Sequence, residues 1–352
     1  MKIAILGLPQ SGKTTLFRAL AAGHYSESGD ANLAVVPVPD PRLQIMSDRE
    51  RSKKIVPSPV TFVDVAGMKT GEDAGARVDK LHVLVTDADA LMLVVQAFGD
   101  MDYDGNSVEP ARALGTLVQE LLLTDLAIVE NRLSRLEREH KARKKGETDS
   151  EWDMLQRVHT HLEQSGWART LEYNDEDTRN LRGFGLLTMR PALVVFNVAE
   201  ADVAGDKAAP WLAAAADIGL PAETACATLE LEMAQLDDEE RAVFLGEYGL
   251  EKAARERLIR AAYKLLDIVT FFTISEIDTH AWTIARGTKA KQAAGAIHSD
   301  IEKGFVRAEV MAYADYVAAE SREAATRAGK QRLEGADYVV QEGDILNVRF
   351  TR

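Results

Sequence analysis

Four short apolar runs recur along the chain and predict buried strands. They are "KIAIL" at 2–6, "TFVDVAG" at 61–67, "ALMLVVQAF" at 90–98 and "PALVVFN" at 191–197. Each run is rich in Val, Ile and Leu and is followed by turn residues, and helical stretches separate several of them. Such strands are typical of a parallel sheet that is covered on both faces. We therefore predict an α/β fold with a doubly wound, mostly parallel sheet.

A helical periodicity fills the segment between the third and fourth runs. Apolar residues recur there at spacings of four and three, at Leu122, Leu126, Val129, Leu133 and Leu136, and again at Leu155, Val158 and Leu162. The polar stretch "KKGETDS" separates the two groups. This pattern predicts two antiparallel helices, each with one apolar stripe, that form an inserted helical hairpin over 105–175.

The C-terminal part has a third pattern. Segments such as "AWTIARGT", "FVRAEVMAY" and "ILNVRF" are rich in strand-forming residues, and "EGAD" and "QEGD" resemble turns. This composition predicts a small, separate α+β domain over 267–352.

Composition narrows the class of protein. The chain has 352 residues, a net charge of −14 and 46% hydrophobic residues, and no apolar run approaches the length of about 18 residues that spans a bilayer. The single Cys226 excludes an internal disulfide framework, and a buried, inert thiol is its plain interpretation. We expect a cytoplasmic protein with no membrane partner.

Positive charge nevertheless gathers near the end of the predicted hairpin. The basic residues there are Arg132, Arg135, Arg138, Lys141, Arg143, Lys144 and Lys145. Glu130, Glu137 and Glu139 lie between them, so a solvated helix face that is balanced by ion pairs explains the pattern as well as an RNA contact does.

The first run leads directly into a phosphate-binding motif. The sequence "GLPQSGKT" matches G-x-x-x-x-G-K-[ST] and stands between a predicted strand and a predicted helix. Lys13 is the candidate catalytic residue, because it would reach the terminal phosphate oxygens, and Thr14 is a candidate Mg²⁺ ligand. The phosphate-binding candidates in this loop are Gly7, Pro9, Gln10, Ser11, Gly12, Lys13, Thr14 and Thr15.

A second motif ends the second run. In "DVAG", Asp64 is a candidate Mg²⁺ ligand, and the backbone N–H of Gly67 is a candidate contact to the terminal phosphate. Alone, this D-x-x-G motif is a weak signal that a simple turn could explain, and the phosphate loop upstream makes a nucleotide-binding role credible. Met68 follows, where Ras-like GTPases carry a glutamine that orients the attacking water.

The fourth run ends in "NVAE", which is a candidate base-binding loop. Asn197 offers hydrogen bonds to a purine edge, whereas Glu200 and Val198 replace the Asp and Lys that grip guanine in GTPases. Because losing a paired hydrogen-bond contact removes discrimination sharply, we expect ATP to bind in preference to GTP.

These motifs together resemble the Obg-like ATPase (YchF) family of P-loop NTPases. The resemblance covers nearly the whole chain and includes "GLPQSGKTTLF", "VVPVPDPRL", "NVAE" and "AWTIARGTKAKQAAGAIHSDIEKGFVRAEV". It implies a coiled-coil hairpin, a C-terminal TGS domain with a ubiquitin-like β-grasp fold, ATP preference and association with ribosomes. The family's base-pocket S-A-K stretch corresponds to Cys226, Ala227 and Thr228, which loses the Lys.

The chain departs from the family pattern around the phosphate site. The segment 24–34 contains no Thr that could sense the terminal phosphate, and only Ser26 and Ser28 offer hydroxyls there. The segment 68–80 is also short, and Gln10-Ser11 replaces the family's Asn-Val. Nucleotide-dependent ordering of these two segments would provide switching.

The resemblance assigns 1–104 and 176–266 to a nucleotide-binding domain, 105–175 to the hairpin and 267–352 to the TGS-like domain. We expect a slow ATPase with ATP and Mg²⁺ as cofactors and a ribosomal particle as partner. A non-hydrolysing ATP-binding module and a GTPase remain alternatives. His298 is a family-like residue that we assign to packing.

Overall fold

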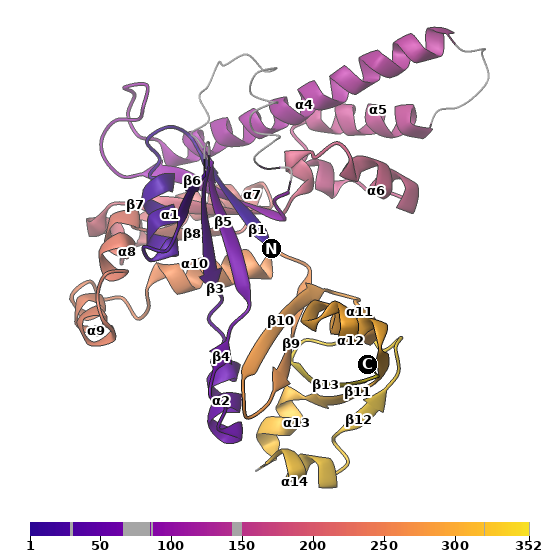
Figure 1. The fold of residues 1–352 in the computed structure, drawn as a ribbon. Coiled ribbons are helices and arrows are strands. Elements are labelled where there is room, and N and C mark those ends of the chain that lie inside the picture. Colours follow the sequence, from indigo (N-terminus) through magenta and orange to yellow (C-terminus); the bar gives the residue numbers. More distant parts are fainter. Residues whose placement is uncertain (29–30, 66–84, 86, 143–149, 320, 352) are drawn as a thin grey trace. The chain divides into compact units, whose positions relative to one another are not determined.

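The structure is a computed structural model, and it describes residues 1–28, 31–65, 85, 87–142, 150–319 and 321–351 (Figure 1). The chain forms two compact units. The first comprises Met1–Val36 and Val60–Leu265, and the second comprises Pro37–Pro59 and Leu266–Arg352.

A seven-stranded sheet forms the centre of the first unit. Its strands, in spatial order, are β2 (Ser26–Ser28), β3 (Ala31–Pro37), β5 (Pro59–Val65), β1 (Lys2–Gly7), β6 (Ala90–Ala97), β7 (Ala192–Val198) and β8 (Ala222–Ala225). Strand β1 pairs in parallel with β5 and β6, and β7 pairs in parallel with β6 and β8. Every residue of β6 and β7 is buried, which explains why these strands have apolar residues on both faces. The predicted α/β class and the four predicted strands are confirmed.

Helices surround this sheet. They are α1 (Lys13–Ala21), α4 (Pro110–Ala142), α5 (Ser150–Glu163), α6 (Asp175–Arg182), α7 (Ala209–Asp217), α8 (Ala227–Met233), α9 (Asp238–Glu247) and α10 (Ala254–Lys264). Short 3-10 turns lie at Ala168–Thr170 (η1), Leu187–Met189 (η2), Glu200–Asp202 (η3) and Asp206–Ala208 (η4). Among the residues that the structure describes, we find no helical segment with the length and apolar character of a transmembrane span.

The predicted helical hairpin is present as α4 and α5. The first half of α4 packs on β6 through Leu114, Leu117 and Leu121, and α5 lies beside the distal half of α4 (Figure 1). Most residues of the predicted stripes are buried, and Leu126 and Leu133 are partly buried. The start of α4 therefore belongs to the core of the sheet, because its apolar face covers β6 before the helix extends beyond the sheet.

A buried carboxylate fixes the base of the hairpin. Asp125 of α4 has no exposed surface and accepts hydrogen bonds from Leu187 N at 2.8 Å, from Thr188 N at 2.8 Å and from Thr188 Oγ1 at 2.5 Å. Burial raises the pKa of Asp125 to about 6, although these donors favour its charged form. The side chain thus ties α4 to η2, 62 residues further along the chain.

The second unit contains a six-stranded mixed sheet. Its strands, in spatial order, are β12 (Arg332–Glu334), β11 (Phe305–Ala312), β13 (Asp344–Phe350), β9 (Ile268–Ile274), β10 (Thr279–Ala285) and β4 (Ile55–Val56). Its helices are α2 (Pro41–Glu50), α11 (Ala290–Ile297), α12 (Ser299–Lys303), α13 (Tyr313–Ala318) and α14 (Arg322–Arg327). Phe271 and Phe272 belong to different apolar clusters, as expected for neighbours that point to opposite faces of a sheet.

The boundary of this unit differs from the one drawn from the sequence. Residues 37–59, which we assigned to the nucleotide-binding domain, fold with the C-terminal residues instead. Arg42 of α2 forms ion pairs with Asp40 and Glu342, both at 2.7 Å, and its guanidinium lies 4.7 Å from the centre of the Phe272 ring. The contacts with Glu342 and Phe272 are long-range, so a local sequence pattern did not predict them.

His298 has a structural role in the same unit. Its Nδ1 accepts a hydrogen bond from the backbone N–H of Asp300 at 3.2 Å and so caps the first turn of α12.

Candidate nucleotide-binding site

A pocket at the carboxyl ends of the parallel strands brings the two main sequence motifs together. Its volume is about 710 Å³. The residues that line it are Gln10, Gly12, Lys13, Thr14, Thr15, Phe98, Gly99, Asn197, Val198, Ala199, Glu200, Ala201, Ala227 and Thr228. Ligands of open α/β folds bind at this edge of the sheet, so the position suits a nucleotide.

The loop between β1 and α1 depends on glycine at two positions. A Cβ atom at Gly7 would lie 2.6 Å from both Ser11 Oγ and Val94 O. Gly12, with φ of +84°, caps α1, and a Cβ atom there would lie 2.1 Å from Asn197 Nδ2. No described side chain caps this end of α1. The first turn thus offers backbone N–H groups and a positive helix end to a phosphate.

Asn197 joins this loop to the loop that precedes α8. It is buried, its Nδ2 donates to Ser11 O at 3.0 Å, and its Oδ1 accepts from Ala227 N at 2.9 Å. We predicted from the sequence that this side chain hydrogen-bonds to the base. In the structure one amide hydrogen and the carbonyl oxygen bind the protein main chain, so the side chain joins two walls of the pocket.

The charged residues of the site lie close to one another. Lys13 is half-buried, and burial lowers the pKa of its ammonium group, whereas the nearby Asp64 carboxylate opposes that shift. Asp64 is 6% exposed, and its Oδ1 has no hydrogen-bond partner among the described residues. A buried carboxylate oxygen without a donor is costly alone and suits a bound cation.

Thr14 and Lys13 line the pocket, and Asp64 interacts with Lys13. A hydroxyl and a carboxylate are suitable oxygen ligands, so the residues present fit a Mg²⁺ ion held by Asp64 and Thr14. Asn32, on β3, donates from Nδ2 to Asp64 Oδ2 at 3.2 Å. The sequence motifs did not point to Asn32. Within the part of the chain that the structure describes, no group of three or more His, Cys, Asp and Glu residues could hold a metal by itself.

The base-binding candidates divide into two groups. Glu200, Ala227 and Thr228 line the pocket, and Glu200 and Thr228 are exposed. Val198 lines it too but is buried in the core of the sheet, at 2% exposure. Cys226 is buried and lines a separate cavity of about 40 Å³.

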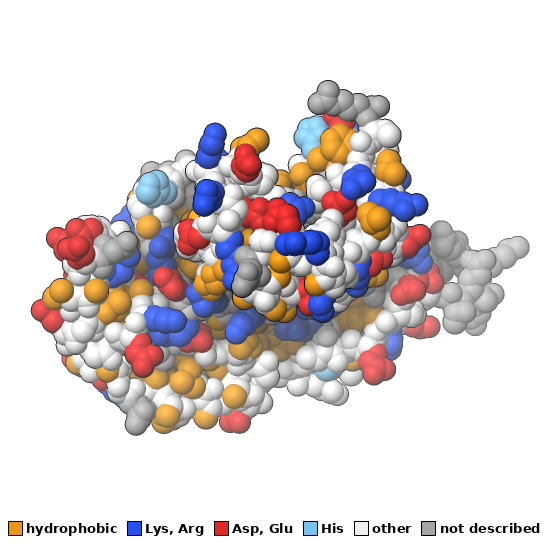
Figure 2. Space-filling view, turned by 90° about the horizontal axis from the view of Figure 1, so that it is seen from below, with side chains coloured by type: hydrophobic (Ala, Val, Ile, Leu, Met, Phe, Trp, Pro, Cys, Tyr) orange, Lys and Arg blue, Asp and Glu red, His pale blue; other side chains and the backbone are white. Residues whose placement is uncertain are grey.

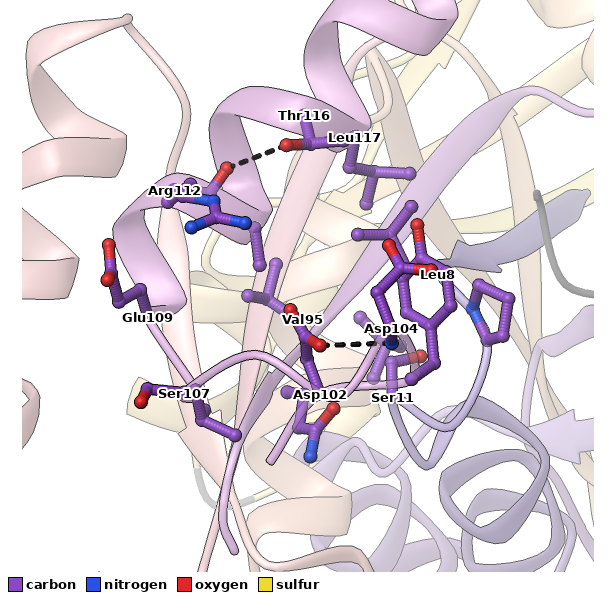
Figure 3. A pocket seen from close by; sticks show the side chains of 16 residues that line it. Leu8, Ser11, Val95, Asp102, Asp104, Ser107, Glu109, Arg112, Thr116 and Leu117 are labelled. Carbon is purple, nitrogen blue, oxygen red and sulfur yellow. Dashed lines mark hydrogen bonds between the residues drawn. The ribbon is translucent and has the colours of Figure 1, made fainter. Parts of the chain in front are cut away.

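Two residues of the phosphate loop face away from the pocket. Pro9 and Ser11 line a second cavity of about 180 Å³ behind the loop, with the segment 102–109 and the start of α4 (Figure 3). The Ser11 hydroxyl is buried and has no described partner. Both residues therefore shape the loop from behind, and neither side chain lines the larger pocket.

Phe98 and Gly99 complete the larger pocket, and the sequence motifs missed both. They follow β6, and their only signal is their position after a predicted parallel strand. Gly67 and Met68 lie outside the described residues, as does the segment 68–80.

Comparisons with known proteins agree with this geometry. Residues 268–351 match the family model YchF-GTPase_C, described as a protein of unknown function (DUF933), and residues 2–132 match a model described as 50S ribosome-binding GTPase. The chain is 36% identical to a curated relative in Pasteurella multocida over 99% of both chains, and 37% identical to one in Bacillus subtilis over 98% of both. The chain belongs to the YchF family.

A solved YchF structure supports the assignment. The Schizosaccharomyces pombe YchF GTPase is 28% identical and superposes with a TM-score of 0.85 over 99% of this chain and 97% of that one. The two bacterial YchF proteins are each named a ribosome-binding ATPase, whereas the yeast YchF protein is named a GTPase. The names within the YchF family thus differ on the nucleotide, and the chemistry of this pocket has to decide it.

Proposed function

We propose that this chain is a Mg²⁺-dependent, ATP-preferring P-loop ATPase with slow turnover that associates with ribosomes. The pocket of about 710 Å³ carries the proposal, because it joins the phosphate loop at Gly12–Thr15 to the segment 197–201. One end suits a triphosphate and the other suits a base. A ribosomal partner places the protein in the cytoplasm.

Lys13 and the loop amides supply the chemistry at the phosphate end. The Lys13 side chain is half-buried, where a charge interacts more strongly with a phosphate than it would in bulk water. Together with the N–H groups at the start of α1, it would stabilise negative charge that develops on the transferred phosphoryl group. A bound Mg²⁺, held by Asp64 and Thr14, would neutralise further phosphate charge.

The base end favours adenine by removing the contacts that guanine needs. Glu200 replaces an Asp and carries one more methylene, Val198 replaces a Lys that would pack along the base, and Thr228 replaces a second Lys. Both Glu200 and Thr228 are exposed and line the pocket, and the Thr228 hydroxyl lies 3.1 Å from Cys226 Sγ, so Thr228 supplies no counterpart of the Lys. Asn197 positions the loops and leaves little hydrogen-bonding capacity to discriminate the bases.

Calorimetric titration with ATP and GTP, each with Mg²⁺, tests the proposal, followed by phosphate release from the nucleotide that binds. We expect ATP to bind more tightly, and Lys13→Ala to lower phosphate release by about 100-fold or more, as is usual on losing a group that stabilises transition-state charge. Lys264→Ala, which removes an exposed lysine of α10, is the matched control and should leave both measurements unchanged.

The same experiment separates the alternatives. Tight ATP binding without any phosphate release would favour a non-hydrolysing module, which the absence of a Thr in 24–34 would explain. Tighter binding of GTP would refute the assignment of the base end. Equal turnover of wild type and Lys13→Ala would remove Lys13 from the mechanism.

We propose that ribosomal RNA is contacted through the basic end of the hairpin. Arg135 and Arg138 are exposed there, whereas Arg132 forms a two-point ion pair with Glu151, at 2.7 and 2.8 Å, and is already neutralised. Figure 2 shows Lys and Arg side chains interspersed with Asp and Glu over one face of the molecule. A chain with a net charge of −14 needs a local concentration of positive charge to bind a polyanion.

Co-sedimentation with ribosomes over a range of salt concentrations tests this contact. Binding should weaken as salt rises, and replacing Arg143, Lys144 and Lys145 with Gln should weaken it further and flatten the salt dependence. These three residues lie outside the described residues. Replacing Lys252, Arg260 and Lys264 with Gln is the matched control, since it removes the same number of exposed positive charges outside the hairpin. Binding that is insensitive to salt, or an equal effect of the control, would exclude the hairpin.

A further inference from the structure

Asn32 is a polar residue of the phosphate site that no sequence motif assigns. It is half-buried on β3, and its Nδ2 lies 3.2 Å from Asp64 Oδ2. Strands β3 and β5 are neighbours in the sheet, so the contact joins two adjacent strands. The Lys13 ammonium group interacts with the same carboxylate.

The chemistry of the pair fixes the orientation of both side chains. An ionised carboxylate only accepts hydrogen bonds, so Asn32 must present its NH₂ group to Asp64. This contact occupies Oδ2 and leaves Oδ1, which is buried and has no hydrogen-bond partner among the described residues. Asp64 is therefore held with one oxygen bound by the protein and one available.

This arrangement resembles the way in which outer groups orient metal ligands. Carboxylates that bind a metal are usually hydrogen-bonded through their other oxygen, which fixes the direction of the free oxygen. Asn32 also belongs to the segment 24–34, where the chain has no Thr. The nearby Ser26 hydroxyl donates to Leu33 O at 3.5 Å and makes no described contact with Asp64.

We propose that Asn32 is a positioning residue for the cation of this site: its Nδ2 donates to Asp64 and directs the other carboxylate oxygen toward a Mg²⁺ ion that accompanies the nucleotide. The inference rests on the proposed function, because it assumes a nucleotide bound with Mg²⁺. The segment 24–34 has no Thr that could contribute to the cation site, and the inference gives the Asn32 side chain on β3 a role there.

Affinity for ATP, measured by calorimetry in Mg²⁺ and again in excess EDTA, tests this role without relying on turnover. The ratio of the two affinities isolates the contribution of the cation. Asn32→Ala should reduce this ratio by about 10-fold or more, which is typical for the loss of an outer hydrogen bond to a metal ligand, and should leave the affinity in EDTA unchanged. The unchanged affinity in EDTA also shows that the variant is folded.

Two further variants sharpen the test. Asn32→Asp keeps the shape but cannot donate to Asp64, so it should lose the Mg²⁺ contribution as Asn32→Ala does, and it carries the test if the alanine variant fails to fold. His24→Ala, an exposed residue of the same segment, is the control and should behave as wild type.

The outcomes distinguish this inference from the proposed function. If wild type binds ATP equally well with and without Mg²⁺, both the proposed Mg²⁺-dependent function and this inference are refuted. If wild type depends on Mg²⁺ but Asn32→Ala retains the full dependence, only the inference is overturned. If Asn32→Asp retains or strengthens the dependence while Asn32→Ala loses it, Asn32 is a direct ligand of the cation, and the positioning role is refuted.

Discussion

Gly12→Ala should abolish tight ATP binding while leaving most of the fold intact. The new Cβ atom would lie 2.1 Å from Asn197 Nδ2. The backbone at Gly12 also has a φ of +84°, a conformation that residues other than glycine rarely adopt. Backbone strain of about 1–3 kcal/mol and steric overlap of about 1–3 kcal/mol must be relieved by moving the loop or Asn197. If about 3 kcal/mol of this energy destabilises the loop conformation that binds ATP, the affinity for ATP drops by about 100-fold.

Gly23→Ala is the matched control for that substitution. Gly23 also has a left-handed backbone, with φ of +78°, but no atom lies within 4 Å of a Cβ atom built there. It should lower the unfolding free energy by about 1 kcal/mol and leave the affinity for ATP unchanged. Titration calorimetry and thermal unfolding of both variants measure these effects. Equal losses of affinity in the two variants would show that the contact with Asn197 does not matter.

Asp125→Ala should lower the unfolding free energy of the first unit by about 3 kcal/mol or more. The substitution removes the acceptor of three hydrogen bonds, and Leu187 N, Thr188 N and the Thr188 hydroxyl would stay buried. Each unsatisfied buried group costs about 1–3 kcal/mol. Urea unfolding at pH 7.5 is suitable because the raised pKa of Asp125, about 6, still leaves the carboxylate ionised there.

Thr188→Val is the matched control at this site. It removes the hydroxyl donor but keeps the shape of the side chain and both backbone hydrogen bonds to Asp125. Its cost should be about 2 kcal/mol, since the hydroxyl loses its hydrogen bond to the charged Asp125 and the weaker one that it accepts from Ala168 N at 3.3 Å. A loss in Asp125→Ala no larger than in Thr188→Val would mean that the backbone donors find other partners, and that Asp125 does not hold η2 on α4.

The phosphate loop could be predicted because its signal is local. The glycines, Lys13 and Thr14 lie within eight residues, between a strand and a helix that their own patterns predict. The same holds for the four buried strands and for the hairpin, where the repeat of apolar residues determines the face that packs.

The hydrogen-bond partners of Asn197 could not be predicted from the local sequence. Its position after a strand predicted the pocket in which it lies, but its hydrogen-bond partners, Ser11 and Ala227, are 186 and 30 residues away. A side chain with two donors and one acceptor has many possible partners, and only the packing of β7 between β6 and β8 selects these two.

The sequence by itself determined the class of fold, the phosphate loop and the resemblance to one family, because short-range periodicity and compact motifs encode them. Only the tertiary structure decided that residues 37–59 fold with the C-terminal unit, that Asn32 binds Asp64 and that Pro9 and Ser11 face a second cavity. These features depend on contacts between segments far apart in the chain. Their energies come from burial and hydrogen bonding that exist only once the strands are paired and the loops are closed.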